Sequence, residues 1–361
     1  MKFSDKDIQQ IEAKGLTLEQ IKDQIALFKG GLPFINLKDA ATIDSGILKF
    51  EKTEKESYIK KFQERRNEIS ILKFVPASGA ATRMFKFLFQ FLADYSLDKE
   101  TINSYINKNK VRDLSVFLIG LEKLPFFEEV IHKVHKNIPN FNDLSYNEQR
   151  LEVIKTMLEE EQLNLALYPK GLLPFHKYKE HVSTAFEEHL FEGAQYASSN
   201  NLANIHFTIS EKHKHRFDKE FKFIEEDVEE RTNTQFNISF SFQKESTDTI
   251  AVNHKNELFR DENNQLVFRP SGHGALIRNL NELDADIIFI KNIDNVVVKK
   301  YKNEVADYKM MLAGVLLEIQ EKAFNYLKQL DTNSSSEAEL LEMAKFVSNK
   351  LNVSVGNEFE K

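Results

Sequence analysis

Residues 73–84 read KFVPASGAATRM and join a predicted strand to a predicted helix through a turn of small residues. The residues from Ile69 to Val75 are mostly apolar and β-branched, which is typical of a buried strand. From Met84 to Leu92, apolar side chains recur at helical spacing. In such a turn, backbone N–H groups and the helix dipole can attract a phosphate group. A tight turn without a ligand explains the same residues, so this stretch alone leaves both interpretations open.

The composition is that of an ordinary globular protein and excludes several kinds of chemistry. A formal net charge of −7 argues against nucleic-acid binding through a basic surface. The absence of cysteine excludes disulfides, thiolate zinc sites and cysteine nucleophiles. The first residues are not followed by the apolar core of a signal peptide, and no apolar run is long enough to span a membrane. We therefore expect a cytoplasmic protein without a membrane partner.

Three later segments have strand patterns and are separated by helical patterns. They are Ile205–Ile209, Phe236–Phe242 and Asp286–Ile290. Buried strands alternating with helices predict an α/β fold with a mixed, mostly parallel, Rossmann-like sheet flanked by helices. In such sheets ligands bind beyond the carboxyl ends of the strands. Arg83 and Asp294 both fall just past such ends.

The strand patterns also suggest how the chain divides into domains. Residues 68–298 are expected to form the α/β domain, and its helical insertion, at about 95–163, shows no strand pattern. Residues 1–67 are expected to form a helical N-terminal extension. Residues 299–361 are expected to form C-terminal helices.

Two further stretches carry residues suited to phosphate chemistry. Residues 168–174, YPKGLLP, place Lys170 between two prolines. A lysine in a rigid loop suits a phosphate contact, although a solvated loop lysine is the simpler explanation of this stretch alone. Residues 269–276, RPSGHGAL, place a glycine on each side of His273 before a predicted helix start.

A helix is expected from about Val182 to Ser198. It carries three glutamates, Glu187, Glu188 and Glu192. Charged residues on a helix most simply form a solvated face, so we expect these carboxylates at the surface.

Taken together, four motifs resemble those of the sugar-1-phosphate nucleotidyltransferases, a GT-A-like superfamily that includes the UDP-sugar pyrophosphorylases. Residues 75–84 resemble their glycine-rich nucleotide loop, and residues 168–174 resemble their lysine motif. Residues 269–276 are similar to their P-x-G-H-G motif, and residues 290–295 to their strand ending in N-x-D-N. The motifs occur in the family's order, over about 69–298. The whole chain also resembles a bacterial domain-of-unknown-function family that carries these variants.

The resemblance implies a GT-A-type fold and a nucleotidyl transfer. A sugar-1-phosphate would attack the α-phosphate of a nucleoside triphosphate, with UTP favoured, to give a nucleoside-diphosphate sugar and pyrophosphate. Such a reaction needs positioning and charge neutralisation more than acid–base groups. Arg83 would neutralise the leaving pyrophosphate, and Lys170 would contact the α-phosphate or the sugar phosphate. Asp294 would hold Mg²⁺, which prefers oxygen ligands.

The same resemblance implies a set of residues that bind the nucleotide. Those of the first loop would hold the triphosphate through backbone N–H groups and are Ala77, Ser78, Gly79, Ala80 and Thr82. Those expected near the base or the sugar are Gln243, Gly272, His273 and Gly274.

Departures from the family's pattern keep other functions open. Ser78 and Ala81 stand where the family has glycine, and a side chain there can block the close approach of a triphosphate. After Asn295 the chain turns helical, where the family adds strands that build the sugar pocket. A catalytically inactive protein that binds a nucleotide or sugar nucleotide is therefore the alternative, and a helical interaction scaffold is a third possibility. No pattern indicates the base, the sugar or the oligomeric state.

Overall fold

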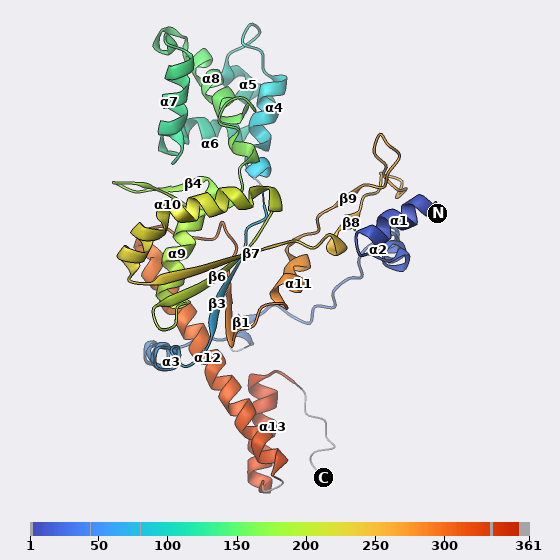
Figure 1. Cartoon of the computed structure of the whole chain (residues 1–361), viewed down its shortest axis with the longest axis vertical. Helices are drawn as coiled ribbons and strands as arrows, with labels where there is room; N and C mark the ends of the chain where they lie inside the picture. The colour runs from blue at the N-terminus through green and yellow to red at the C-terminus, as the bar shows by residue number, and fades with distance from the viewer. Residues whose placement is uncertain (1–2, 44, 80, 333–334, 354–361) are drawn as a thin grey trace. The chain divides into compact units, whose positions relative to one another are not determined.

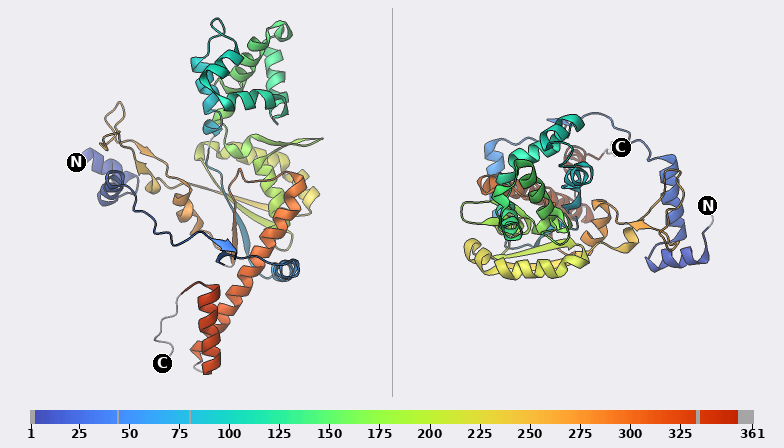
Figure 2. Two further views of the ribbon diagram at one scale, coloured as in Figure 1. Left: turned by 180° about the vertical axis from the view of Figure 1, so that it is seen from behind. Right: turned by 90° about the horizontal axis from the view of Figure 1, so that it is seen from above.

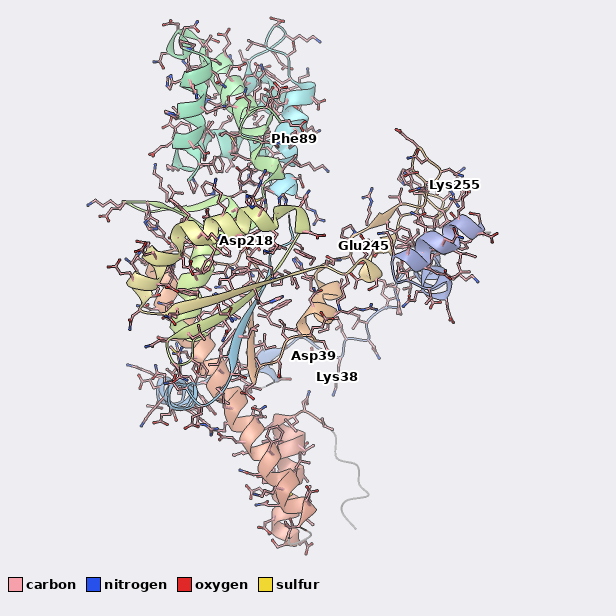
Figure 3. The ribbon with its side chains drawn as sticks, in the orientation of Figure 1. Lys38, Asp39, Phe89, Asp218, Glu245 and Lys255 are labelled. Atoms are coloured by element: carbon pink, nitrogen blue, oxygen red, sulfur yellow. The ribbon has the colours of Figure 1, made fainter. Side chains whose placement is uncertain are left out.

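The computed structural model describes residues 3–43, 45–79, 81–332 and 335–353. The chain divides into two compact units, one formed by Met1–Lys38 with Ile71–Lys300 and the other by Asp39–Ser70 with Tyr301–Lys361. Lys38 and Asp39, at the first boundary, are labelled in Figure 3. The first 38 residues therefore group with the sheet, and residues 39–70 group with the C-terminal helices.

A four-stranded parallel sheet lies at the centre of the first unit (Figure 1). Its order is β10 (Ile287–Ile290), β3 (Ile71–Pro76), β6 (Leu202–Ile209) and β7 (Gln235–Phe242). Every neighbouring pair is parallel. The expected α/β fold with a parallel sheet flanked by helices is thus confirmed.

One face of the sheet packs against two helices, α9 (Ala185–Tyr196) and α10 (Lys214–Thr232). Successive strand residues point to opposite faces. The apolar residues at every second position of β6, from Ala203 to Ile209, therefore join this core. The rings of Phe186 and Phe207 lie 4.7 Å apart, and those of Phe186 and Phe217 lie 5.5 Å apart. Burial of each such ring contributes about 1.5–3 kcal/mol, which fixes α9 against the sheet.

A helical insertion follows β3 and forms a bundle that Figure 2 shows from two further sides. Its helices and 3-10 turns are η1 (Ala81–Arg83), α4 (Lys86–Asp94), α5 (Ile102–Asn109), α6 (Arg112–Gly120), η2 (Leu121–Lys123), α7 (Phe127–Asn137), η3 (Phe141–Asp143) and α8 (Tyr146–Leu158). It has a hydrophobic core of its own, which includes the fully buried Leu88, Leu114 and Ile154. The chain returns to the sheet through η4 (Leu165–Leu167), η5 (Lys170–Leu172), β4 (Pro174–Lys177) and β5 (Val182–Thr184).

The N-terminal helices pack on a small antiparallel sheet in the same unit. These elements are α1 (Asp5–Ala13), α2 (Leu18–Gly30), β8 (Thr249–Ile250) and β9 (Phe268–Arg269), and they share a separate apolar core. A capping box opens α2, with hydrogen bonds in both directions between Thr17 and Gln20. Short elements link these parts to the main sheet: η7 (Glu245–Thr247), η8 (His273–Leu276) and α11 (Ile277–Leu280). A further short turn, η6 (Glu211–His213), joins β6 to α10.

The second unit is built on long helices. It contains α3 (Lys52–Arg65), most of α12 (Lys299–Asp331), α13 (Glu337–Lys350) and the short strands β1 (Thr42–Ile43) and β2 (Gly46–Ile47). At Gly314 the backbones of α12 and α3 approach so closely that an added Cβ would lie 2.0 Å from the carbonyl oxygen of Tyr58. Within the described residues, no helix has the length and apolar character needed to cross a membrane.

Candidate functional site

The strand order creates a switch point between β3 and β10. Starting at β3, the chain adds β6 and then β7 on one side, and later places β10 on the other side of β3. Loops that leave two such strands in opposite directions open a crevice at the carboxyl edge of the sheet. Beyond β10, the N–H of Lys291 donates to the carbonyl of Phe74 and that of Ile293 to the carbonyl of Pro76, both at 3.1 Å. Asp294 therefore emerges next to the loop that follows β3.

The segment around Lys170 is hydrogen-bonded to that loop. The Lys170 N–H donates to the carbonyl of Gly79 at 3.1 Å, and the Ala81 N–H donates to the carbonyl of Tyr168 at 3.2 Å. The Lys170 Nζ lies 2.7 Å from Oδ2 of Asp294. Three stretches far apart in the sequence, all of them expected at the site, thus meet at one corner of the sheet.

The Asp294 carboxylate is ionised, and its contact with Lys170 is reachable from solvent. The hydrogen bond from Lys170 holds the pKa of Asp294 below its ordinary value, against the opposing effect of burial, and His273 contributes a smaller lowering. The side chains are 28% and 40% exposed. His273 therefore lies within electrostatic range of this carboxylate, although it comes from a different loop.

Part of the expected phosphate cradle is engaged by the fold. The N–H of Ala77 donates to the carbonyl of Thr208 at 2.8 Å, and Ala77 is buried, so this residue extends the sheet. Ser78 is half-buried, whereas the other described residues expected to face a phosphate are exposed, namely Gly79, Thr82 and Arg83. Ala80 lies outside the described residues.

The glycine loop at 272–274 is exposed and open. A Cβ added at Gly272 or Gly274 would meet nothing within 4 Å, and neither glycine adopts a positive φ. The fold thus requires glycine at neither position, which leaves room for the backbone to approach a ligand. The side-chain amide of Gln243 donates to the carbonyl of Ser271 at 3.1 Å. Gln243 therefore anchors this loop through the same amide that was expected to reach a base.

His189 of α9, which the sequence analysis did not identify, is hydrogen-bonded to the loop that follows β10 and carries Asp294. Its Nε2–H donates to the carbonyl oxygens of Asn292 and Ile293, each at 3.2 Å. The ring is fully buried, and burial, followed by the charges of nearby lysines, lowers its pKa well below the ordinary value. A neutral imidazole therefore holds the two residues that precede Asp294.

A buried ion cluster joins Glu192 of the same helix to Lys291, at the start of that loop, and to Lys73 of β3. The oxygens of Glu192 lie 2.7 and 2.8 Å from Nζ of Lys291, and one lies 3.4 Å from Nζ of Lys73. The Tyr196 hydroxyl donates to the same carboxylate at 3.1 Å. The only signal in the sequence was a lysine inside the apolar strand at residue 73.

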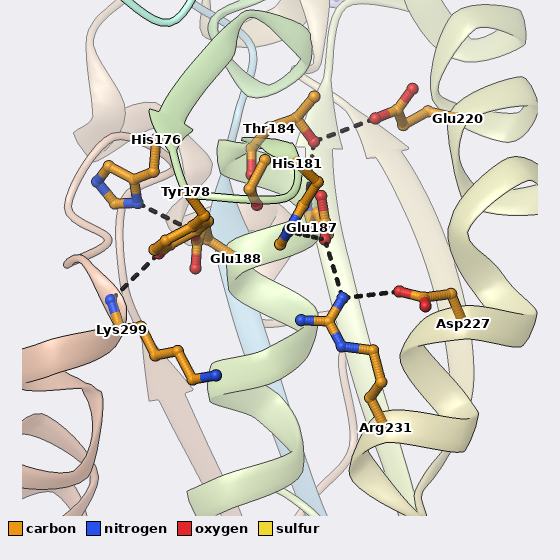
Figure 4. Close-up of polar contacts among 11 residues, drawn as sticks. His176, Tyr178, His181, Thr184, Glu187, Glu188, Glu220, Asp227, Arg231 and Lys299 are labelled. Carbon is orange, nitrogen blue, oxygen red and sulfur yellow. Dashed lines mark hydrogen bonds and ion pairs between the residues drawn. The ribbon is translucent and has the colours of Figure 1, made fainter.

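The prediction that the three glutamates of this helix form a solvated face is wrong. Glu187, Glu188 and Glu192 are all buried, because the β4–β5 hairpin, α10 and the sheet cover α9. Figure 4 shows the polar groups that compensate: His176 Nδ1 lies 2.9 Å from Oε1 of Glu188, and the Tyr178 hydroxyl donates to that oxygen at 2.6 Å. Burial raises the pKa of Glu187.

The donor set is compatible with Mg²⁺ only when substrate supplies further ligands. Asp294 offers an ionised, accessible carboxylate. Among the described residues there is no group of three or more histidines or carboxylates that could hold a metal. Mg²⁺ commonly binds one or two carboxylates and completes its shell with water and substrate phosphates, which suits this corner.

A separate hollow of about 490 Å³ lies in the helical insertion, away from the sheet edge. It is lined by Phe87, Gln90, Asp94, Tyr105, Asn109, Lys110, Val111, Arg112 and Asp113. None of these residues belongs to the expected nucleotide motifs, so the hollow is not part of the candidate site.

Comparison with known families is consistent with this picture at a coarse level. One family model matches residues 4–361. The chain belongs to the DUF4301 family. That family is described as a domain of unknown function, which confirms the expected kind of family and assigns no activity to it. No curated protein and no solved structure matches this DUF4301 chain.

Proposed function

We propose that this DUF4301 protein is a cytoplasmic nucleotidyltransferase with a GT-A-type sheet. It would transfer a nucleotidyl group from a nucleoside triphosphate, with UTP favoured, to a sugar-1-phosphate. The observation that carries the proposal is the Lys170–Asp294 pair, with Nζ and Oδ2 2.7 Å apart, beside the exposed Gly79 at the switch point of a parallel sheet. Such a point is where α/β sheets bind ligands.

The chemistry needs one bond to form and one to break. An oxygen of the sugar phosphate attacks the α-phosphorus, the bond from that phosphorus to the bridging oxygen of the β-phosphate breaks, and pyrophosphate leaves with the electron pair. No proton transfer is required, because the attacking oxygen is already ionised. The protein contributes positioning and charge stabilisation, which account for most of the acceleration in phosphoryl transfer.

The residues of the corner divide these tasks. The N–H groups of Ser78, Gly79 and Thr82 would bind phosphate oxygens at the start of η1. When the substrate binds, Lys170 would exchange part of its contact with Asp294 for a phosphate oxygen. Bound Mg²⁺ would neutralise the phosphates, and Asp294 would be its protein ligand. Arg83, exposed in η1, would stabilise the charge that develops on the leaving pyrophosphate.

Exchange of radiolabelled pyrophosphate into UTP, in the presence of Mg²⁺ and a panel of sugar-1-phosphates, tests the proposal. We expect exchange by the wild type and a loss of about a hundredfold or more in Arg83→Ala, which removes a charge that acts mainly in the transition state. Lys86→Ala, which removes an exposed cation three residues further on, is the matched control and should leave the rate unchanged. No exchange with any nucleoside triphosphate would refute the enzymatic proposal.

The second candidate is a nucleotide- or sugar-nucleotide-binding protein without activity. It is favoured by the absence, among the described residues, of three or more grouped side chains that could hold a metal. It is also favoured by Ser78, whose side chain stands where the related enzymes have glycine. This candidate predicts calorimetric binding of UTP or a UDP-sugar together with pyrophosphate exchange at background level. Exchange would then be the same in wild type and Arg83→Ala.

A further inference from the structure

The helix that follows β6 starts at the same edge of the sheet as the candidate site. β6 neighbours β3, and its carboxyl end leads through Ser210 and η6 into α10 (Figure 1). Helix α10 has 19 residues. The N-terminal end of such a helix carries partial positive charge and N–H groups without an intrahelical partner.

Arg216 lies over the ring of Tyr168 at this edge, and the turn that contains Arg83 is hydrogen-bonded to the Tyr168 backbone. The guanidinium of Arg216, in the first turn of α10, lies 4.6 Å from the centroid of the Tyr168 ring. The carbonyl of Tyr168 accepts the N–H of Ala81, which opens the turn that ends at Arg83. Within the part of the chain that the structure describes, neither arginine forms an ion pair with a carboxylate. By contrast, Lys214 lies 2.6 Å from a carboxylate oxygen of Asp218.

A buried polar atom at the start of α10 independently indicates a missing partner. Within the described residues, Nε2 of His213, the residue that precedes α10, has no hydrogen-bond partner. His213 is 7% exposed. A buried polar group without a partner costs about 1–3 kcal/mol, which a bound ligand or water can recover. Burial lowers the pKa of His213, and so do the charges of Lys212 and Arg216, so the ring lies in the field of Arg216.

The negative charge of a bound nucleotide at the proposed site also favours a second cationic side chain. Lys170 is compensated by Asp294 at 2.7 Å, so Arg83 would otherwise face the phosphates as the one uncompensated side chain named there. A nucleoside triphosphate remains anionic after it binds one Mg²⁺. Arg216, stacked on Tyr168, is held by the same segment that positions Lys170.

We propose that Arg216 and the N-terminal end of α10 form a second anion subsite that takes a phosphate group. This inference deepens the proposed function and rests on it for the choice of substrate. The phosphate has two possible sources, the terminal phosphates of the nucleoside triphosphate or the phosphate of the sugar-1-phosphate. Contact with the Tyr168 ring restricts the guanidinium, and a guanidinium can bind two phosphate oxygens through its N–H groups.

Calorimetric titration with inorganic pyrophosphate tests the subsite without a nucleotide. We expect Arg216→Ala to bind pyrophosphate about tenfold or more weakly than the wild type, the loss expected for a charge-assisted bidentate contact. Arg216→Lys, which keeps the charge but not the stacked plane, should give an intermediate affinity. Lys222→Ala removes an exposed cation later on the same helix and should bind as the wild type does. Equal affinity of wild type and Arg216→Ala would overturn the subsite.

Two further titrations identify the source of the phosphate. If the subsite holds the terminal phosphates, Arg216→Ala weakens UTP binding and leaves UMP binding unchanged. If it holds the acceptor, the variant weakens sugar-1-phosphate binding and leaves UTP binding unchanged. Loss of pyrophosphate binding in Arg216→Ala, in a wild type that binds no nucleoside triphosphate, would support the anion subsite while refuting the proposed function. If Arg216→Ala binds UTP, the sugar-1-phosphate and pyrophosphate as tightly as the wild type does, the subsite is refuted and the proposed function is not.

Discussion

The substitution Glu192→Gln removes a negative charge that lies between two buried lysines. The side chains of Glu192 and Lys73 are 0% exposed, and that of Lys291 is 9% exposed. Burial acts to raise the pKa of Glu192, but the two ammonium groups outweigh it and the pKa lies below its ordinary value. Glutamine keeps the shape of the side chain and one oxygen acceptor, so the change acts mainly on charge.

The magnitude follows from the cost of leaving a buried charge unpaired. Removing one partner of a buried ion pair typically costs about 3–5 kcal/mol. The loss should depend on pH: once the Glu192 carboxylate is removed, burial lowers the pKa of Lys73 below its unfolded value of about 10.4. The unfolded state then binds more protons, so the stability of the variant rises as the pH increases from 7 towards 10.

Urea denaturation followed by circular dichroism at pH 7 and pH 9.5 measures both effects. We expect Glu192→Gln to lose about 3–5 kcal/mol at pH 7 and to recover part of this at pH 9.5. Glu230→Gln, an exposed carboxylate on α10, is the matched control and should stay within about 0.5 kcal/mol of the wild type. A loss below about 1 kcal/mol at pH 7, or a loss independent of pH, would refute the assignment of a buried ion cluster.

Three further predictions concern other parts of the molecule. The carboxylate of Asp7 is buried, and its pKa is lowered chiefly by its hydrogen bonds from Arg260. The contribution of this pair is therefore present above a pH of about 4 and is lost as the pH falls, and Asp7→Asn should remove that pH dependence in acid-unfolding curves at a cost of about 2 kcal/mol. Gly314→Ala should cost about 3 kcal/mol or more, because the new Cβ would overlap a backbone carbonyl of α3; hydrogen exchange that stays equally slow in α3 would contradict this. Gly274→Ala should fold normally in a thermal melt yet bind UTP more weakly in calorimetry, whereas Gly120→Ala, also in open space, should change neither; unchanged UTP binding in the first variant would argue against a ligand at that loop.

Most of the sheet could be predicted because its strands have recognisable hydrophobic patterns in the sequence. The alternation from Phe236 to Phe242 corresponds to β7, which covers Gln235–Phe242. The apolar run from Asp286 to Ile290 corresponds to β10. The helical insertion was visible for the converse reason, since no strand pattern interrupts it. Local patterns suffice where each element buries a face that its own spacing defines.

The pairing of strands could not be read in the same way. The position of β10 beside β3 depends on which edge of the sheet remains open after β6 and β7 have added, and spacing in the sequence does not encode it. The meeting of Lys170 with Asp294 is a consequence of that order. The resemblance to known motifs suggested that both residues act at one site, whereas the sheet topology accounts for their contact.

The support beneath the site was missed because its members look ordinary in isolation. Glu192 lies on a helix whose glutamates were expected at the surface, and its partner Lys73 precedes it by 119 residues. Only the packing of α9 against the sheet turns a charged helix face into a buried one. A lysine in the middle of an apolar strand was the one local sign that a buried carboxylate would be needed, since a buried charge requires a partner.

The central claim is that the corner formed by Gly79, Lys170 and Asp294 binds a nucleotide. Calorimetric titration of UTP in the presence of Mg²⁺ tests it most directly, with Lys170→Ala as the variant and Lys177→Ala as the matched control. Lys177 also lies 2.7 Å from a carboxylate oxygen, but its partner is Glu128, in the helical insertion. The account predicts one UTP site in the wild type and in Lys177→Ala, and an affinity about tenfold or more weaker in Lys170→Ala. No UTP binding by the wild type, or equal affinity in all three proteins, would contradict it.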